Sequence, residues 1–302
     1  MIEMKHLDIK FDNQIIFKNA NFKTCPGKIT GIIGKSGCGK TTFLKALIYQ
    51  YSNQTLSIDE QVITDKNKED YLLNYVSYID QFGTFFENMK IREHFEFISQ
   101  LKNQGFDQDK MLEMLHLVRL DNIDLSYFLS SLSIGQRKRF LIALAMYKDA
   151  SIIIIDEPTA SLDQENKEII LNLLQKLKKD NKYIIITTHD DFLIEHLDIV
   201  YEIENKQLYC HQEIKEVQKN LKIENTKHQR IKKYFFYKNQ RQWFQFILVM
   251  LLGFIMTVSI SINISDSILQ ENQLANGIER ANKAEVYTGK MNDAFLEMMV
   301  IL

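Results

Sequence analysis

The sequence predicts an α/β fold that carries a helical insertion and is followed by one membrane-spanning helix. Short apolar runs rich in isoleucine alternate with stretches of helical spacing, which is the pattern of an α/β protein. The strand signal disappears over about residues 85–135, and residues 242–265 include no charged side chain. The 302 residues are 45% hydrophobic and 25% charged, a globular composition that excludes disorder throughout the chain.

Most of the predicted strands are short apolar runs. The runs LDIKF and NANFK alternate near the N-terminus, and ITGII at 29–33 is continuously apolar beside a glycine. Later runs of the same kind cover 76–79, 151–156 and 183–188. Because these runs are continuously apolar, we expect them to be buried on both faces, as the strands of a parallel sheet are.

Helical spacing separates these runs. It is clearest in KRFLIALAMYK at 138–148 and in NKEIILNLLQKLKKD at 166–180. The mixed-polarity stretch at about 85–135 is interpreted as a helical subdomain inserted into the α/β core. Together these segments predict one domain over residues 1–212, in which three scattered cysteines show no metal-ligand spacing and favour a reducing compartment.

A glycine-rich loop, GKSGCGKT at 34–41, lies between a predicted strand and a predicted helix. Two glycines with four residues between them, then lysine and a hydroxyl, form the pattern whose backbone N–H groups wrap a β-phosphate. In this pattern Lys40 reaches the β- and γ-phosphates, Thr41 helps to hold Mg²⁺, and the helix directs its positive end at the phosphates. The strand–loop–helix context disfavours a plain glycine-rich turn. The predicted phosphate-contacting residues are Gly34, Lys35, Ser36, Gly37, Cys38, Gly39, Lys40, Thr41 and Thr42.

Two adjacent carboxylates end the run SIIIID and open the next segment. Asp156 at the strand end can meet Mg²⁺ through water, and Glu157 can orient or deprotonate an attacking water. Adjacent carboxylates are often only a solvated strand end. Four isoleucines precede this pair, so we expect it at the edge of a dry sheet, where an unpaired charge is costly and is usually kept for chemistry.

The segment LSIGQRKR at 132–139 resembles the signature motif of ATP-binding-cassette (ABC) proteins, and it precedes the Asp156–Glu157 pair as the motif does in that family. The resemblance covers about residues 1–212. It implies a P-loop NTPase nucleotide-binding domain of the ABC type, with the helical subdomain inserted at about 85–135. ATP and Mg²⁺ are then the implied substrate and cofactor.

The same resemblance gives roles to residues that carry no signal by themselves. Gln81 looks like the glutamine that links the nucleotide site to the helical subdomain, and His189 looks like the switch histidine. Phe11 falls where the family places an aromatic residue against adenine. The implied catalytic residues are therefore Glu157, His189 and Gln81, and the implied Mg²⁺ ligands are Thr41, Gln81 and Asp156.

The resemblance further implies a second ABC subunit, in a homodimer or a heterodimer, packed head to tail around ATP. The residues implied at the shared site are Ser133, Gly135, Gln136 and Asp163. The sequence departs from the family pattern at Ile134, where glycine is commonest, and at Phe11, where tyrosine is commoner. Because stacking on a base needs only a π face, phenylalanine is expected to serve.

The chain changes character after residue 212. The net charge of −2 hides a dense positive run within 213–241, which either lies along a lipid surface or forms a solvated linker. The uncharged run 242–265 is long enough for one bilayer crossing, with a buried soluble helix as the alternative. Basic and aromatic residues crowd its N-terminal side, which orients that side to the cytoplasm and residues 266–302 to the exterior.

A cassette followed by a basic segment and one membrane helix resembles the beginning of a MacB-type exporter. Such exporters continue through a large extracytoplasmic domain and further helices, whereas this sequence stops, so we expect truncation or a multi-span membrane partner. The expected function is ATP hydrolysis for efflux at a bacterial cell membrane, with a peptide or bacteriocin-like compound as candidate substrate. The alternative is a membrane-anchored ATP-dependent switch that regulates an envelope or signalling partner. The span disfavours a soluble cassette in translation or DNA repair, so no nucleic-acid partner is expected.

Overall fold

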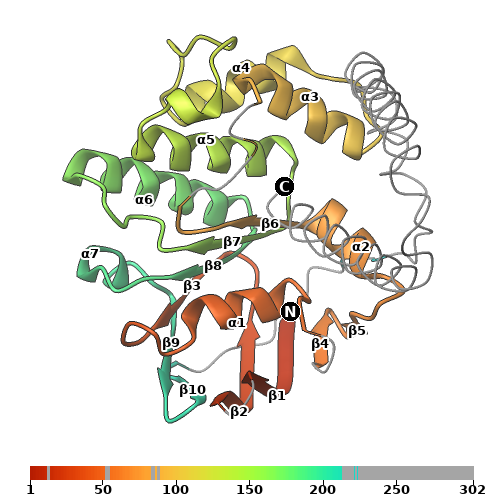
Figure 1. Ribbon diagram of the computed structural model, residues 1–302, viewed down its shortest axis with the longest axis vertical. Coiled ribbons are helices and arrows are strands. Elements are labelled where there is room, and N and C mark those ends of the chain that lie inside the picture. The colour runs from red at the N-terminus through yellow and green to blue at the C-terminus, as the bar shows by residue number, and fades with distance from the viewer. Residues whose placement is uncertain are drawn as a thin grey trace, which may run out of the picture. The chain divides into compact units, whose positions relative to one another are not determined.

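The computed structural model describes most of the first 212 residues and two positions beyond them (Figure 1). The described residues are 1–11, 14–51, 55–82, 86, 89–212, 221 and 223. The predicted membrane span 242–265, its outer segment 266–302 and nearly all of the basic segment 213–241 lie outside the described residues. Within the described part, no helix has the length and apolar character needed to cross a bilayer.

A six-stranded sheet forms the centre of the described chain, in the strand order β10-β9-β3-β8-β7-β6. Five neighbouring strands run parallel, and β10 pairs antiparallel with β9 at one edge. The strands are β3 (Lys28–Ile33), β6 (Val76–Ile79), β7 (Ile152–Asp156), β8 (Tyr183–Thr187), β9 (Ile199–Glu204) and β10 (Gln207–Cys210). The continuously apolar runs are therefore strands of a parallel sheet, as predicted.

Both faces of this sheet are covered. Alternate residues such as Ile152 and Ile154 pack into one core cluster with helix α1 (Lys40–Leu47), while Ile153 points to the other face and is fully buried there. Helix α6 (Gln164–Lys179) contacts β8 and β3. Figure 1 shows α1 on one side of the sheet and α6 with α5 on the other.

A second, antiparallel sheet covers α1 from its other side. Its strand order is β2-β1-β4-β5, with β1 (Ile2–Phe11), β2 (Gln14–Thr24), β4 (Thr55–Ile58) and β5 (Gln61–Val62). The rings of Phe22 and Phe43 lie 5.0 Å apart in an edge contact, which joins β2 to α1. The first two strands agree with the alternating runs, whereas β4 and β5 were not predicted.

The inserted segment is helical, as expected. It contains α3 (Ile91–Leu101), α4 (Gln108–Leu117) and a 3-10 turn (Leu129–Ser131), and both helices contact α5 (Ile134–Tyr147). Helix α5 begins four residues before the predicted run, because Ser133 caps it in a capping box with Gln136. The remaining described elements are α2 (Lys68–Asp70), a π-helical turn (Tyr71–Tyr75) and α7 (Asp191–Ile194).

Candidate active site

The glycine-rich loop connects β3 to α1 and takes a conformation that only glycine adopts easily. Gly39 has φ +108°, and a Cβ atom there would lie 2.8 Å from Cγ2 of Ile16. Gly37 also has a positive φ, of +76°. The Lys40 ammonium group folds back over the loop and donates to the carbonyl oxygens of Gly34 at 2.9 Å and Lys35 at 3.4 Å. The loop therefore surrounds a cation and presents its backbone to a pocket.

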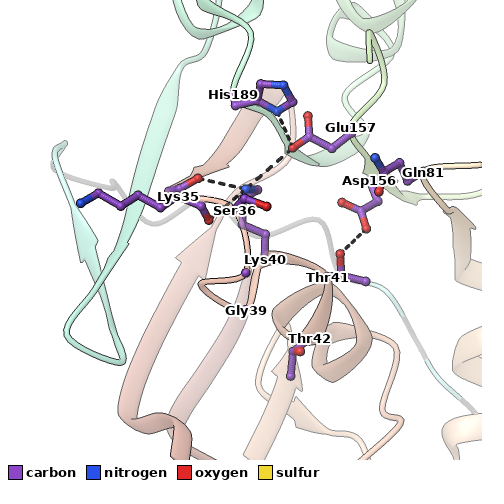
Figure 2. Close-up of a pocket in the computed structure, with 12 residues that line it drawn as sticks. Lys35, Ser36, Gly39, Lys40, Thr41, Thr42, Gln81, Asp156, Glu157 and His189 are labelled. Carbon is purple, nitrogen blue, oxygen red and sulfur yellow. Dashed lines mark hydrogen bonds and ion pairs between the residues drawn. The ribbon is translucent and has the colours of Figure 1, made fainter. Parts of the chain in front are cut away.

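This pocket has a volume of about 560 Å³. It lies where the loop meets the carboxyl ends of β6, β7 and β8, the edge at which open α/β sheets bind ligands. Figure 2 shows Glu157 between His189 and Lys40, with Asp156 facing Thr41 and the Lys35 side chain extending away. The lining residues are Gly34, Lys35, Ser36, Gly37, Gly39, Lys40, Thr41, Thr42, Gln81, Asp156, Glu157 and His189.

Asp156 is held at the end of β7 by two hydroxyl groups. Thr41 Oγ1 donates to its Oδ2 at 2.6 Å, and the Thr187 hydroxyl donates to its other carboxylate oxygen. The Thr187 hydroxyl in turn accepts the backbone N–H of Glu157 at 2.9 Å. Asp156 is only 2% exposed, so these bonds fix its carboxylate toward α1.

The oxygen atoms near Thr41 suit a magnesium ion. Mg²⁺ prefers hard oxygen ligands and is commonly bound through one or two carboxylates together with substrate phosphates and water. The Thr41 hydroxyl and the Asp156 carboxylate already lie within hydrogen-bond distance at the pocket, and the Gln81 side chain lines the same space. In the described part of the chain, no cluster of three or more His, Cys, Asp or Glu residues could hold a metal by itself. The site therefore fits a metal that arrives with phosphates.

Glu157 is the most constrained residue of the pocket. Its Oε1 lies 2.9 Å from His189 Nδ1 and 3.8 Å from Lys40 Nζ. Its backbone has φ +51°, a left-handed conformation that costs a residue with a side chain about 1 to 3 kcal/mol. Glu157 is 6% exposed, so surrounding contacts must hold this conformation. A buried carboxylate beside a histidine and a lysine is an arrangement suited to moving a proton.

Lys138 binds the backbone of the same residue, and it was not identified from the sequence. Its ammonium group donates to the backbone oxygens of Glu157 at 2.7 Å and Ala160 at 3.0 Å. Burial lowers the pKa of Lys138 to about 8, although the nearby charges of Glu157 and Asp156 oppose this shift. One pattern could have found it: Lys138 shares a helix face with the apolar Ile142 and Ala145, both buried.

Several predicted site residues do not line this pocket. Phe11 is 46% exposed at the end of β1 and makes an edge contact with Tyr51. Cys38 is partly buried and donates its backbone N–H to Lys35. Ser133 caps α5 and accepts the Gln136 N–H at 3.2 Å.

Gly135 and Asp163 are placed by the packing of α5 and α6. A Cβ atom at Gly135 would lie 3.0 Å from Oδ1 of Asn166, so glycine permits the close approach of the two helices. Asp163 caps α6 and accepts the Asn166 N–H at 2.8 Å, a bond that lowers the pKa of its carboxyl group. Within one chain these residues are helix caps and packing positions, and their assignment to a shared site stays a prediction.

Comparison with known proteins places the chain among nucleotide-driven transport components. The profile of the ABC transporter family matches residues 17–160. The lipoprotein-releasing system ATP-binding protein LolD of Buchnera aphidicola is 33% identical over 201 residues, which span 64% of this chain and 88% of LolD. The xylose import ATP-binding protein XylG of Histophilus somni is 31% identical over 199 residues, and these span 63% of this chain but only 39% of XylG.

Solved structures agree with the fold. A dimeric post-hydrolysis structure of the ATP-binding cassette MJ0796 bound to ADP and Pi superposes with a TM-score of 0.62. The match is 24% identical and covers 69% of this chain and 96% of that one.

Proposed function

Because this chain belongs to the ABC transporter ATPases, we propose that ATP hydrolysis in the pocket described above drives export across a bacterial cell membrane. The observation that carries the site is the convergence of Lys40, Glu157 and His189 at the carboxyl edge of the parallel sheet. The proposal of export rests on the order of segments in the sequence, with a basic stretch and the uncharged run 242–265 after the cassette.

In the proposed site, the loop and its lysine bind the phosphates of ATP. Most of the loop 34–39 and the start of α1 line the pocket, so the positive end of the helix dipole lies beside it. Lys40 is placed for the β- and γ-phosphates once it leaves the carbonyl of Gly34. Thr41, Asp156 and Gln81 would hold Mg²⁺, which when bound supplies charge neutralisation for phosphoryl transfer.

Glu157 and His189 complete the proposed reaction. Glu157 accepts a proton from the water that attacks the γ-phosphate, and His189 contacts the same phosphate. Lys40 Nζ lies 3.8 Å from Glu157 Oε1, so the lysine and the carboxylate that would accept the proton face the same space. No other carboxylate besides Asp156 lines this pocket in the described residues, and Asp156 is occupied by two hydroxyl groups.

A second subunit would complete the nucleotide site. Ser133 and Ile134 at the start of α5 are exposed, and Ile134 is an apolar residue with 55% of its surface open to solvent. We place these residues, with Gly135, Gln136 and Asp163, against the nucleotide of the other subunit. Phe11 is proposed to meet the adenine ring. ATP then holds the two subunits together, and hydrolysis lets them separate.

The proposed direction of transport and the proposed substrate rest on the order of segments in the sequence. LolD belongs to a lipoprotein-releasing system and XylG to xylose import, so the relatives include both release and import. The MacB-like order of segments supports efflux, with a peptide or bacteriocin-like substrate as candidate. A single span such as the predicted run 242–265 does not enclose a conduit, so export would need further membrane helices, which a multi-span partner would supply. Without such a partner, the same feature favours a membrane-anchored switch.

Replacing the proposed base tests the site. Glu157→Gln in the full chain should lower kcat for ATP by roughly 10²- to 10⁴-fold, because an amide cannot accept the proton of the attacking water. Binding of ATP, measured by calorimetry, should remain, since the glutamine keeps the shape of the side chain. A variant that hydrolyses ATP as fast as the parent protein would show that Glu157 is not the base.

A further inference from the structure

We propose that Lys138 is a positioning residue for ATP hydrolysis, whose ammonium group fixes the main chain of Glu157 and thereby joins the start of α5 to the reacting carboxylate of the same chain. This inference rests on the proposed role of Glu157 as the base. Three features of the protein support this role: the burial of Lys138, the left-handed backbone of Glu157, and the hydrogen bonds of the turn that follows Glu157.

Lys138 is built into the interior as a backbone ligand. It is 3% exposed, and its two hydrogen bonds go to the carbonyl oxygens of Glu157 at 2.7 Å and Ala160 at 3.0 Å. These carbonyls open and close one turn, whose own bond runs from the Ala160 N–H to the Glu157 oxygen at 3.3 Å. Burial of a lysine ammonium group costs free energy because the group loses its hydration. Among the residues that the structure describes, no carboxylate pairs with this ammonium group, so its hydrogen bonds to the two carbonyls of the turn must offset that cost.

The turn needs support because Glu157 is held in a left-handed conformation, with φ +51°. Two side chains form hydrogen bonds with its backbone, one with the N–H group and one with the carbonyl oxygen. The Thr187 hydroxyl accepts its N–H at 2.9 Å, and Lys138 donates to its C=O at 2.7 Å. With both backbone groups held, the carboxylate is directed at His189 and Lys40.

The same turn connects to the rest of the site. Thr159 donates to Asp190 Oδ2 at 2.7 Å, one residue after His189, and Lys167 of α6 lies 2.8 Å from the same oxygen. Lys138 itself lies little more than one helical turn from Ser133, the cap of α5. A displacement of the α5 start by a second subunit therefore reaches Glu157 through a single side chain.

Replacing Lys138 by methionine removes both hydrogen bonds and keeps most of the volume. We expect Lys138→Met in the full chain to lower kcat for ATP by roughly 10- to 100-fold, the scale of a misplaced reacting group, with the Kd for ATP unchanged. In the background of Glu157→Gln, measured in single turnover, Lys138→Met should cause no further loss, because a residue that acts through Glu157 has nothing left to position.

The matched control is the other lysine buried at the far end of α5. Lys148 donates to the carbonyl oxygens of Leu72 at 3.1 Å and Val76 at 2.6 Å, away from the pocket. Lys148→Met removes a similar pair of bonds and should leave kcat unchanged. Melting temperatures of both variants show whether a loss of folded protein explains the rates. If Lys138→Met does not fold, Lys138→Gln, whose shorter amide does not span both carbonyls, should show the same fall in kcat.

Two results would overturn the proposal. One is a parental kcat in the folded Lys138 variant, and the other is an equal loss from Lys138→Met with and without Glu157→Gln, which marks a structural effect independent of the base. The proposed base fails separately: a parental rate in Glu157→Gln alone would remove the role of Glu157 and with it the positioning role. If Glu157→Gln lowers kcat and Lys138→Met keeps the parental kcat, only the positioning role of Lys138 is overturned.

Discussion

At the residue scale, the Lys40 side chain is shared between the glycine loop and a carboxylate. Its ammonium group donates to the Gly34 carbonyl at 2.9 Å and lies 3.8 Å from Glu157 Oε1. Only 11% of the side chain is exposed, so this cation is partly desolvated. We expect the Lys40 ammonium group to bind phosphate oxygens, because the Gly34 carbonyl and the Glu157 carboxylate are weaker acceptors than a phosphate dianion.

Lys40→Ala should therefore weaken the binding of Mg²⁺–ATP. Loss of charge-assisted hydrogen bonds worth about 1.5 to 3 kcal/mol predicts a Kd raised by roughly 10- to 150-fold, measurable by calorimetry. Lys45→Ala, a substitution in the last turn of the same helix and outside the pocket lining, is the matched control. An unchanged affinity in Lys40→Ala would count against a phosphate-binding role for this residue.

Only some of the site residues could be recognised from the sequence. The glycine loop and the Asp156–Glu157 pair could be recognised because each depends on a short segment next to a strand. A helix-face pattern could have marked Lys138 as buried, but the partners of Lys138 and Thr187 could not be recognised. These partners lie 19 and 30 residues away along the chain and meet them only after folding. The left-handed backbone of Glu157 gives no sequence signal, because glutamate is not the residue that such a position favours.

At the scale of elements, α5 is fastened at both ends by lysines that bind backbone carbonyls. Near its start Lys138 holds the turn after β7, and at its C-terminal cap Lys148 holds the π-helical turn and the start of β6. The helix therefore connects the signature segment to two parallel strands, β6 and β7, whose carboxyl ends lie at the pocket. Burial lowers the pKa of Lys148 to about 7, with the Lys102 charge acting in the same direction.

This burial predicts a pH dependence of stability. The folded pKa of Lys148, about 7, lies below its value in the unfolded chain, so between pH 7 and 10 the unfolded state binds more protons. The contribution of Lys148 to the free energy of unfolding therefore rises with pH in this window, by at most roughly 1.4 kcal/mol per unit. Lys148→Met should flatten the rise in urea denaturation measured from pH 7 to 10.

The control for this experiment replaces an exposed lysine instead of a buried one. Lys179→Met changes an exposed lysine in the last turn of α6. Equal pH slopes for Lys148→Met and the parent protein would show that burial does not lower the pKa of Lys148 in the folded protein. The comparison stays below pH 10, because burial also raises the pKa of Tyr71 and Tyr183, whose ionisation would then lower stability.

At the scale of the whole molecule, the described residues form the nucleotide-binding cassette, and the proposed membrane segment lies elsewhere in the sequence. The cassette has the fold of ABC nucleotide-binding domains, and the predicted span 242–265 lies outside the described residues. ATP hydrolysis belongs to the cassette, whereas its coupling to export is part of the proposed function. The proposed export function is therefore tested best on the complete protein in its native membrane.

We expect the full-length chain to fractionate with membranes and, after extraction in mild detergent, to co-purify with a multi-span membrane protein identified by mass spectrometry. The physical reason is that one uncharged span anchors a chain but does not form a conduit. Deletion of 242–265 is the control and should move the protein to the soluble fraction. Unchanged membrane association after that deletion would contradict the predicted span, and recovery as a homodimer without a partner would favour the switch over the transporter.

The sequence by itself determined the parallel strands β3, β6, β7 and β8, the inserted helices, the glycine loop and the identity of the acidic pair, because each depends on spacing within a few neighbouring residues. Tertiary structure alone decided strands β4, β5, β9 and β10, the start of α5 at its Ser133 cap, and the hydrogen bonds of Lys138 and Thr187 to the backbone of Glu157. These features depend on contacts between distant segments. Short polar strands and a lysine on a helix face acquire their meaning only from the partners that folding brings to them.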